Sequence, residues 1–193
     1  MTVQEKIGMP LDEFIRQTND EMFELINGER VPRLPTITRH NDTIDKLSMF
    51  LKMNAELKNL GIVRSEATYI LSDRYDPSWV TGSRTPDLLF IGIDRLSAYR
   101  QAHPNWQETP YLIVPDLVIE VVSPNDRVIE LDSKIDAYLA DGVRLIIVVN
   151  PQSRKAIVYA PDAEQPLHLS GSTQIVLSDV IPDLNIALPS LFE

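Results

Sequence analysis

The chain has 193 residues, of which 44% are hydrophobic and 24% charged, and its 18 basic and 28 acidic residues give a net charge of −10. This composition is that of a globular protein long enough for one sizeable core, and the acidic balance argues against a protein that coats nucleic acid through bulk electrostatics. The absence of cysteine excludes disulfides, thiolate zinc sites, iron–sulfur clusters and cysteine nucleophiles, and it fits a cytoplasmic location. No apolar run is long enough to span a membrane, and residues 1–10 lack the apolar segment of a signal peptide. We therefore expect one domain over residues 1–193, with no membrane as a partner.

The N-terminal part of the chain predicts a helix, a hairpin and a long second helix. Apolar residues with helical spacing follow Pro10, which suits a first helical turn. Residues 22–31 hold two short apolar runs around an Asn-Gly pair, the strongest short-range signal for a hairpin. An apolar stripe predicts a helix over residues 42–60, and Gly61 is placed to end it.

The rest of the chain predicts a sheet with helices between its strands. The apolar run at 144–149 is typical of a strand buried on both faces, and a helix over 132–140 precedes it. The step from residue 118 to residue 149 is a natural parallel crossover. Residues 94–110 form a loop or a short helix, and the other expected strands are 62–71, 87–91, 117–122, 156–159 and 175–177. The fold class is therefore α/β.

The motifs of several enzyme classes are missing. The sequence has no Gly-rich phosphate loop ending in Lys-Ser/Thr, no G-x-G-x-x-G, no G-x-S-x-G and no H-E-x-x-H. Its three histidines, His40, His103 and His168, are few for a zinc site or a Ser-His-Asp triad.

The segment 115–124 carries the first chemical signal. Glu120 lies inside an apolar run, where a carboxylate is costly unless it is paired, protonated or bound to a metal. Asp116 shares its strand face but lies about 13 Å away at roughly 3.3 Å per residue, too far to share one ion comfortably. A metal partner for Glu120 must therefore come from elsewhere.

Asp87 offers that partner, because it opens the apolar strand 87–91. Lys134 borders the apolar face of the next helix and is placed to point its ammonium towards the carboxylates. Two carboxylates suit Mg²⁺ or Mn²⁺, and the lysine suits an attacking water or a phosphate. A structural ion pair around Glu120, and simple turn chemistry at Asp87, explain the same spacing, so the residues alone leave both interpretations open.

At these residues the sequence resembles the PD-(D/E)XK nuclease superfamily and, more closely, the bacterial Uma-type restriction-endonuclease family. The resemblance extends over most of the chain, and it is carried by the order and spacing of several short matching segments. They are FELINGE (23–29), His40, TPDLLFI (85–91), PDLVIEVVSP (115–124), Lys134, YLADGV (138–143), VVNP (148–151) and IPDLNIAL (181–188).

The resemblance implies a restriction-endonuclease-like core over about residues 20–160: a mixed sheet flanked by helices, with an N-terminal helix and hairpin extension and short C-terminal strands at 165–190. It also implies a site that uses Mg²⁺ or Mn²⁺ to hydrolyse phosphodiester bonds. Asp87 matches the acid of the PD motif and Glu120 that of the (D/E)XK strand, so both are the implied metal ligands. Val122 stands at the expected lysine position, and Lys134 on the following helix is the implied catalytic replacement.

Three more residues are auxiliary candidates. Glu24 matches the glutamate of the early hairpin, as a further ligand or water-holder, and His40 matches a recurring histidine that would contact substrate. Asp116 is retained as an auxiliary acid despite its distance from Glu120. Basic residues expected near the site, to contact DNA locally, are Arg39, Arg84 and Arg127.

Three functions remain open at this point. The first is a metal-dependent endonuclease acting on DNA, which the set of Asp87, Glu120 and Lys134 favours. The second is a catalytically weak or inactive nuclease-fold protein that binds a partner or forms a homodimer, which the net charge favours. The third is a metal-dependent hydrolase of another phosphate ester.

Overall fold

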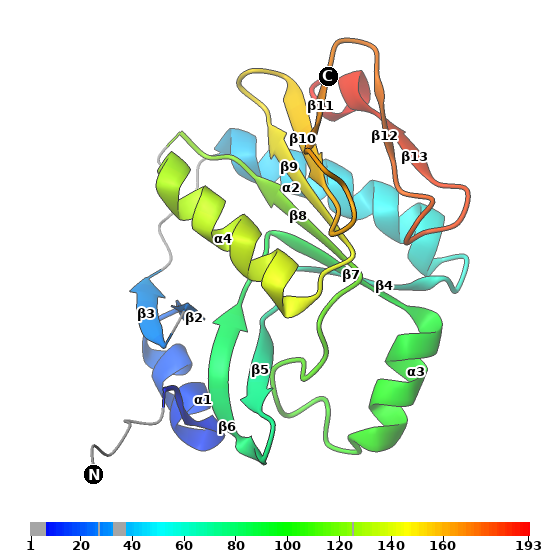
Figure 1. The fold of residues 1–193 in the computed structure, drawn as a ribbon. Helices are drawn as coiled ribbons and strands as arrows, with labels where there is room; N and C mark the ends of the chain where they lie inside the picture. Colours follow the sequence, from blue (N-terminus) through cyan, green and yellow to red (C-terminus); the bar gives the residue numbers. More distant parts are fainter. Residues whose placement is uncertain (1–6, 27, 33–37, 125) are drawn as a thin grey trace.

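The computed structural model describes residues 7–26, 28–32, 38–124 and 126–193. Its centre is a six-stranded sheet in the order β11-β10-β9-β8-β7-β4, in which β8 and β9 are parallel and every other neighbouring pair is antiparallel (Figure 1). The strands are β4 (Gly61–Ser65), β7 (Leu88–Gly92), β8 (Leu117–Val121), β9 (Leu145–Asn150), β10 (Lys155–Tyr159) and β11 (Leu167–Ser170). The sheet is mixed, and the predicted parallel crossover is confirmed.

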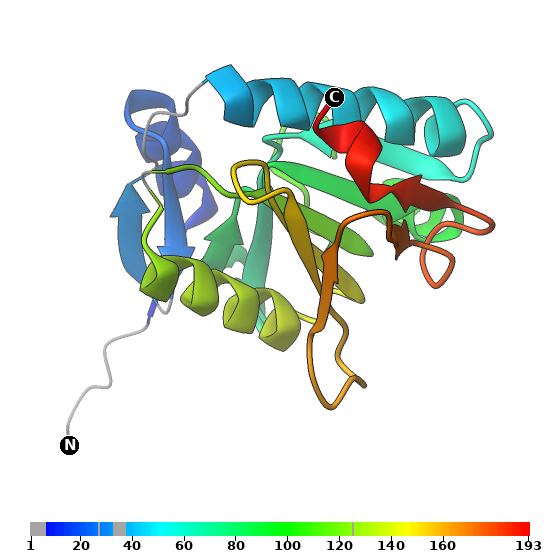
Figure 2. The ribbon, with the colours of Figure 1, turned by 90° about the horizontal axis from the view of Figure 1, so that it is seen from above.

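Two helices cover opposite faces of this sheet, as Figure 2 shows from above. On one face, α2 (Thr38–Leu51) packs its apolar stripe against alternate residues of β8 and β9. On the other face, α4 (Val128–Asp141) packs Ile135 and Tyr138 against Val118, Ile146 and Val148. Burial on both faces explains the continuous apolar runs of β8 and β9.

A smaller unit beside α4 combines the predicted N-terminal helix and hairpin with two strands from the middle of the chain. It contains α1 (Leu11–Asp20), the hairpin of β2 (Phe23–Ile26) and β3 (Glu29–Pro32), and a sheet of β1 (Met9–Pro10), β6 (Asp76–Arg84) and β5 (Tyr69–Asp73). Phe14, Leu25 and Val80 belong to its apolar core. Gly28 takes φ 84° in the hairpin turn, a left-handed conformation that favours glycine; its neighbour Asn27 lies outside the described residues.

The remaining elements flank the central sheet. The polar stretch predicted as a loop or a short helix contains α3 (Ile93–Ala102), and the chain ends in β12 (Gln174–Val176), β13 (Asn185–Ala187) and the short helix η2 (Leu188–Leu191). The C-terminal strands contribute to the apolar core on the α2 side. Within the described residues, every helix is too short or too polar to traverse a lipid bilayer.

Two predictions about residues 42–71 are wrong: the end of the long helix and the strand that follows it. The long helix passes into a π-helical turn, η1 (Lys52–Glu56), and Asn59, at φ 56°, takes the left-handed conformation expected of Gly61. Gly61 instead opens β4, where an added Cβ would lie 2.2 Å from the carbonyl oxygen of Ile91. The single strand predicted over 62–71 is two strands in different sheets, because the chain turns at Glu66, which has φ 49°.

Candidate active site

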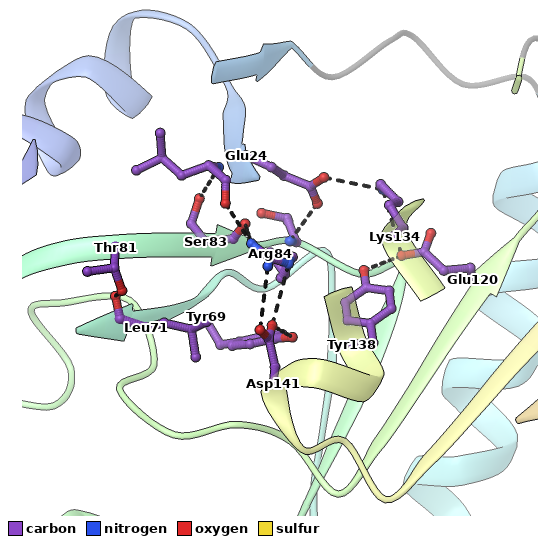
Figure 3. A network of polar contacts seen from close by, with 12 residues as sticks. Glu24, Tyr69, Leu71, Thr81, Ser83, Arg84, Glu120, Lys134, Tyr138 and Asp141 are labelled. Atoms are coloured by element: carbon purple, nitrogen blue, oxygen red, sulfur yellow. Dashed lines mark hydrogen bonds and ion pairs between the residues drawn. The ribbon is translucent and has the colours of Figure 1, made fainter. Parts of the chain in front are cut away.

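Three buried carboxylates and a lysine meet at the carboxyl end of β8, beneath α4. Glu24 comes from β2, Asp87 from the residue before β7, Glu120 from β8 and Lys134 from α4. Glu24, Asp87 and Glu120 are 1%, 5% and 6% exposed. Figure 3 shows the part of this site in which Glu24 and Glu120 approach Lys134. The fold therefore gathers four of the predicted site residues from four separate elements.

Strand register places Asp87 next to Glu120. Leu88 pairs with Ile119 in the antiparallel ladder of β7 and β8, so the preceding residue, Asp87, comes opposite Glu120. The backbone N–H of Val121 donates a hydrogen bond of 2.7 Å to Asp87 Oδ2. This bond holds the Asp87 carboxylate at the end of β8.

The lysine lies between the other two carboxylates. Lys134 Nζ is 3.5 Å from Glu24 Oε2 and 3.7 Å from Glu120 Oε1, so the predicted direction of its ammonium is confirmed. The second oxygen of Glu24, Oε1, accepts a hydrogen bond of 2.7 Å from the backbone N–H of Thr85. Lys134 is therefore the bridge between the hairpin and the central strand.

The sequence analysis missed Tyr138. It lies one helical turn beyond Lys134 on the same face of α4, it is fully buried, and its hydroxyl donates a hydrogen bond to Glu120 Oε1. Its polar oxygen, four residues after a site lysine on the apolar face of the helix, was the available signal. Tyr138 and Lys134 thus hold the same oxygen of Glu120.

Glu120 is a buried carboxyl group with two other carboxylates nearby, and both conditions raise its pKa. Burial raises the pKa of Glu120 to about 7; the charges of Asp87 and Glu24 add to the rise, whereas Lys134 and the Tyr138 hydrogen bond oppose it. Burial, together with the adjacent carboxylates, also raises the pKa of Tyr138. One ammonium does not offset three buried carboxylates, so a further cation would relieve their repulsion.

His40 borders the site from the opposite face of the sheet. It lies in the first turn of α2, buried, with Nε2 3.4 Å from Asp87 Oδ1. Burial lowers the pKa of His40, but the Asp87 carboxylate, a hydrogen bond to the Val121 backbone and the Asp126 charge together outweigh burial, so the pKa is raised overall. At 3.4 Å, the contact between His40 and Asp87 is an ion pair when the imidazole is protonated.

Arg84 does not belong to a DNA-contacting surface, and that prediction is wrong. It is 5% exposed, and its guanidinium donates to the carbonyl of Leu25 at 2.6 Å and forms an ion pair of 3.4 Å with Asp141 at the end of α4 (Figure 3). Tyr69 donates a hydrogen bond of 2.8 Å to the same Asp141 carboxylate. Arg84 therefore joins the hairpin that carries Glu24 to the helix that carries Lys134.

Asp116 lies apart from the cluster, at the other end of β8. Its carboxylate accepts hydrogen bonds of 2.9 Å from the Gly92 N–H, 2.8 Å from Arg95 and 3.2 Å from Arg144. An auxiliary role for Asp116 in the site is therefore not supported, and the reason is the distance along the strand that its spacing indicates.

The carboxylates of this site are suitable ligands for a hard divalent cation, but few of them are placed to bind one ion. Carboxylate oxygens are the ligands that Mg²⁺ and Mn²⁺ prefer, and a site with two carboxylates leaves positions for water and substrate phosphate. Within the described residues, no three His, Cys, Asp or Glu side chains are grouped as metal ligands. The residues thus fit a cation held by two carboxylates, Asp87 and Glu120, rather than an all-protein cage.

This fold and its acid cluster define the class: a restriction-endonuclease-like α/β protein with a mixed sheet. The model of the Uma2 family, described as "Putative restriction endonuclease", matches residues 11–189, and the chain belongs to that family. A solved structure described as "a putative nuclease belonging to DUF820", from Anabaena variabilis ATCC 29413, is similar with a TM-score of 0.77 and 17% identity. That match covers 95% of this chain and 97% of that one. No curated protein matches. The predicted family and fold class are confirmed.

Proposed function

We propose that this protein is a metal-dependent endonuclease that hydrolyses phosphodiester bonds of DNA, with Mg²⁺ or Mn²⁺ as its cofactor. The observation that carries the proposal is the position of Lys134 Nζ, which lies 3.5 Å from Glu24 and 3.7 Å from Glu120 among three buried carboxylates. An excess of buried negative charge is unfavourable for a structural cluster and suits a site that receives a cation.

Asp87 and Glu120 would hold the metal ion. When bound, the ion supplies positive charge for the phosphoryl oxygens and lowers the pKa of the attacking water. Asp87 is oriented for this role by the Val121 N–H, and Glu120 by the Tyr138 hydroxyl. Both carboxylates are thus preorganised by the end of β8 and by α4.

Lys134 has the role of the superfamily lysine. Its ammonium donates hydrogen bonds to the attacking water or to a phosphate oxygen, where negative charge develops during hydrolysis. Glu24 assists from the hairpin: with one oxygen held by the Thr85 N–H and the other near Lys134, it keeps the ammonium beside Glu120. Glu24 is therefore a positioning residue for Lys134.

The test is cleavage of supercoiled plasmid DNA at low salt by purified protein, with Mg²⁺, Mn²⁺ or chelator. Wild type is compared with Asp87→Asn and Glu120→Gln at matched purity. We expect nicking or cutting that needs metal and that both substitutions remove. Equal cutting by all three proteins would identify a contaminant and contradict the proposal.

A second candidate is a nuclease-fold protein without activity that binds a partner or a second copy. The observation in its favour is that Lys134 and Tyr138 already satisfy one oxygen of Glu120, as in a structural ion pair, in a chain of net charge −10. Calorimetric titration with Mn²⁺ separates the two candidates. Saturable binding that Glu120→Gln removes supports the endonuclease, and no binding together with no cleavage supports the second candidate.

A further inference from the structure

The long helix formed by α2 and η1 carries two apolar stripes rather than one. The inner stripe, which includes Ile44 and Leu47, is buried against the central sheet. The outer stripe consists of Met49, Met53 and Leu57, which recur every four residues and are 62%, 58% and 77% exposed. Figure 2 shows α2 at the periphery of the molecule, with the sheet on its inner side. A surface helix normally turns a polar face outwards, and clustered exposed apolar side chains mark an interaction surface.

The exposed charges beside the outer stripe change sign along the helix. The N-terminal half exposes Asp42 and Asp45, and the C-terminal end exposes Lys52 and Lys58. Charges of opposite sign on facing surfaces favour association and set its orientation, whereas like charges oppose it. An antiparallel copy of the same helix would therefore bring aspartates next to lysines at both ends, whereas a parallel copy would bring aspartates next to aspartates. The outer stripe is thus complementary to itself in the reversed direction.

Two further charges near the outer stripe are paired within the chain. Lys46 Nζ donates a hydrogen bond to the backbone carbonyl of Glu193, and Glu56 Oε1 forms an ion pair of 2.8 Å with Arg64 Nη1 on β4. These contacts hold both side chains towards neighbouring parts of the same molecule. The change of sign along the outer surface is therefore set by the four exposed residues.

We propose that the outer stripe is the interface of a homodimer, in which the helix of α2 and η1 packs antiparallel against the same helix of a second copy. The methionines and Leu57 of the two copies pack together, and Asp45 of each copy lies near the partner's Lys52. An interface about a two-fold axis uses the same surface on both copies, so it requires this kind of self-complementarity. One helix pair is small compared with the interface of a permanent dimer, so we expect a Kd in the micromolar range.

This dimer does not rest on the proposed endonuclease function. α2 begins at Thr38, and His40 in its first turn contacts Asp87 of the candidate active site. Because the two helices run in opposite directions, the two candidate sites lie at opposite ends of the interface. Each site is then built from one copy, so dimerisation and DNA cleavage should be separable by substitution.

The test is sedimentation velocity of the full chain in chelator and at low salt, from about 1 to about 200 μM. We expect the mass to rise with concentration from 21.9 kDa towards twice that value. Met53→Lys should weaken the dimer at least about tenfold, because it places a charge in the apolar contact. Met22→Lys is the matched control, since Met22 is 54% exposed and lies outside the outer stripe, and it should leave the dimer unchanged.

A charge exchange tests the antiparallel arrangement. Asp45→Lys alone and Lys52→Asp alone should each weaken the dimer by about tenfold, because each substitution alters two symmetry-related pairs. The chain that carries both substitutions should regain most of the affinity of the wild type. A protein that stays monomeric over the whole range, a dimer that Met53→Lys does not weaken, or a double variant weaker than both single variants would overturn the proposal.

Discussion

The two ends of β8 each bury an acid, and they treat it in opposite ways. Asp116, before the strand, accepts hydrogen bonds from Arg95, Arg144 and the Gly92 N–H. One carboxylate there has two guanidinium partners, both of which reach solvent. This is the charge balance of a structural ion pair that fastens β8 to its neighbours.

At the far end of β8 the balance is reversed. Three carboxylates meet there: Lys134 pairs with Glu24 and Glu120, and His40 contacts Asp87. Burial raises the pKa of Glu120 to about 7. Burial of an acid therefore does not by itself mark a functional site, because Asp116 is the more buried of the two. The excess of negative over positive charge at one end distinguishes the two positions.

The largest expected effect is that a substitution at the Glu120 end lowers DNA cleavage, whereas one at the Asp116 end lowers the free energy of unfolding. Glu120→Gln keeps the shape but removes a ligand charge, and we expect DNA cleavage to fall by about a thousandfold. Asp116→Asn should leave cleavage within about threefold but lower the free energy of unfolding by roughly 1–3 kcal/mol, through its weakened buried contacts. Plasmid cleavage rates and urea denaturation, measured on both variants, check the pair.

The two substitutions control for each other, since each exchanges one buried carboxylate for an amide of the same size. Glu120→Gln should not lower the stability of the metal-free protein at pH 8, because it removes like-charge repulsion. Equal losses of activity in both variants would show that the two ends are not functionally distinct.

The next effect concerns Lys134. Lys134→Ala should lower cleavage by about a hundredfold, because it removes the positive charge beside the reacting phosphate. The affinity for Mn²⁺ at pH 8, measured by calorimetry, should stay the same or improve slightly, because a neighbouring cation is lost. Unchanged cleavage would return Lys134 to the role of a structural ion-pair partner.

A smaller effect is the pH dependence of stability. Glu120 has a pKa near 7 in the folded protein and about 4.5 when unfolded, so between these values the folded state binds more protons. Stability therefore decreases as pH rises through this interval, by roughly 2 kcal/mol between pH 5 and pH 7 from this group. Urea denaturation in chelator at several pH values measures it.

Glu120→Gln is the control for this pH dependence, because it removes the titrating group. The decrease in stability with pH should become smaller in the variant by the contribution of Glu120. Adding Mn²⁺ to wild type at pH 8 should restore stability, since a ligand that binds only the folded state stabilises it. A pH profile that is the same in wild type and variant would contradict the raised pKa.

Much of the central sheet could be predicted from the sequence. Continuous apolar runs identify β8 and β9, and a helix between them requires the parallel crossover. The pairing of Asp87 with Glu120 followed from acids at the ends of apolar strands, and the position of Lys134 from its place on the helix. Each of these signals lies within one short segment: an apolar run, an acid in or beside it, or a lysine on the face of one helix.

The parts that were not predicted depend on distant contacts or on backbone conformation. The split of residues 62–71 into two sheets needs the turn at Glu66, which has no glycine or proline to announce it. Arg84 resembles a surface residue in sequence, yet its partners Leu25 and Asp141 are 59 and 57 residues away. The contact of Tyr138 with Glu120 was missed, because the apolar face of a helix does not reveal which hydroxyl meets an acid.

The smallest expected effect tests which end of β8 faces DNA. In a chain of net charge −10, affinity for DNA must come from a few local cations, and each phosphate contact adds to the salt dependence of binding. Arg127 stands before α4, on the side of the proposed site, and its side chain is 80% exposed. Arg127→Gln should therefore reduce the slope of log affinity against log salt by about 1. Arg95→Gln removes the same charge from the Asp116 end, away from the proposed site, and should leave the slope unchanged. Both guanidiniums have a carboxylate partner, Glu130 for Arg127 and Asp116 for Arg95, so the two variants differ in position along β8. Fluorescence anisotropy measures both slopes on the Glu120→Gln background, in which we expect cleavage to be about a thousandfold slower. A larger change for Arg95→Gln than for Arg127→Gln would place the DNA at the wrong end of the strand and separate it from the acid cluster.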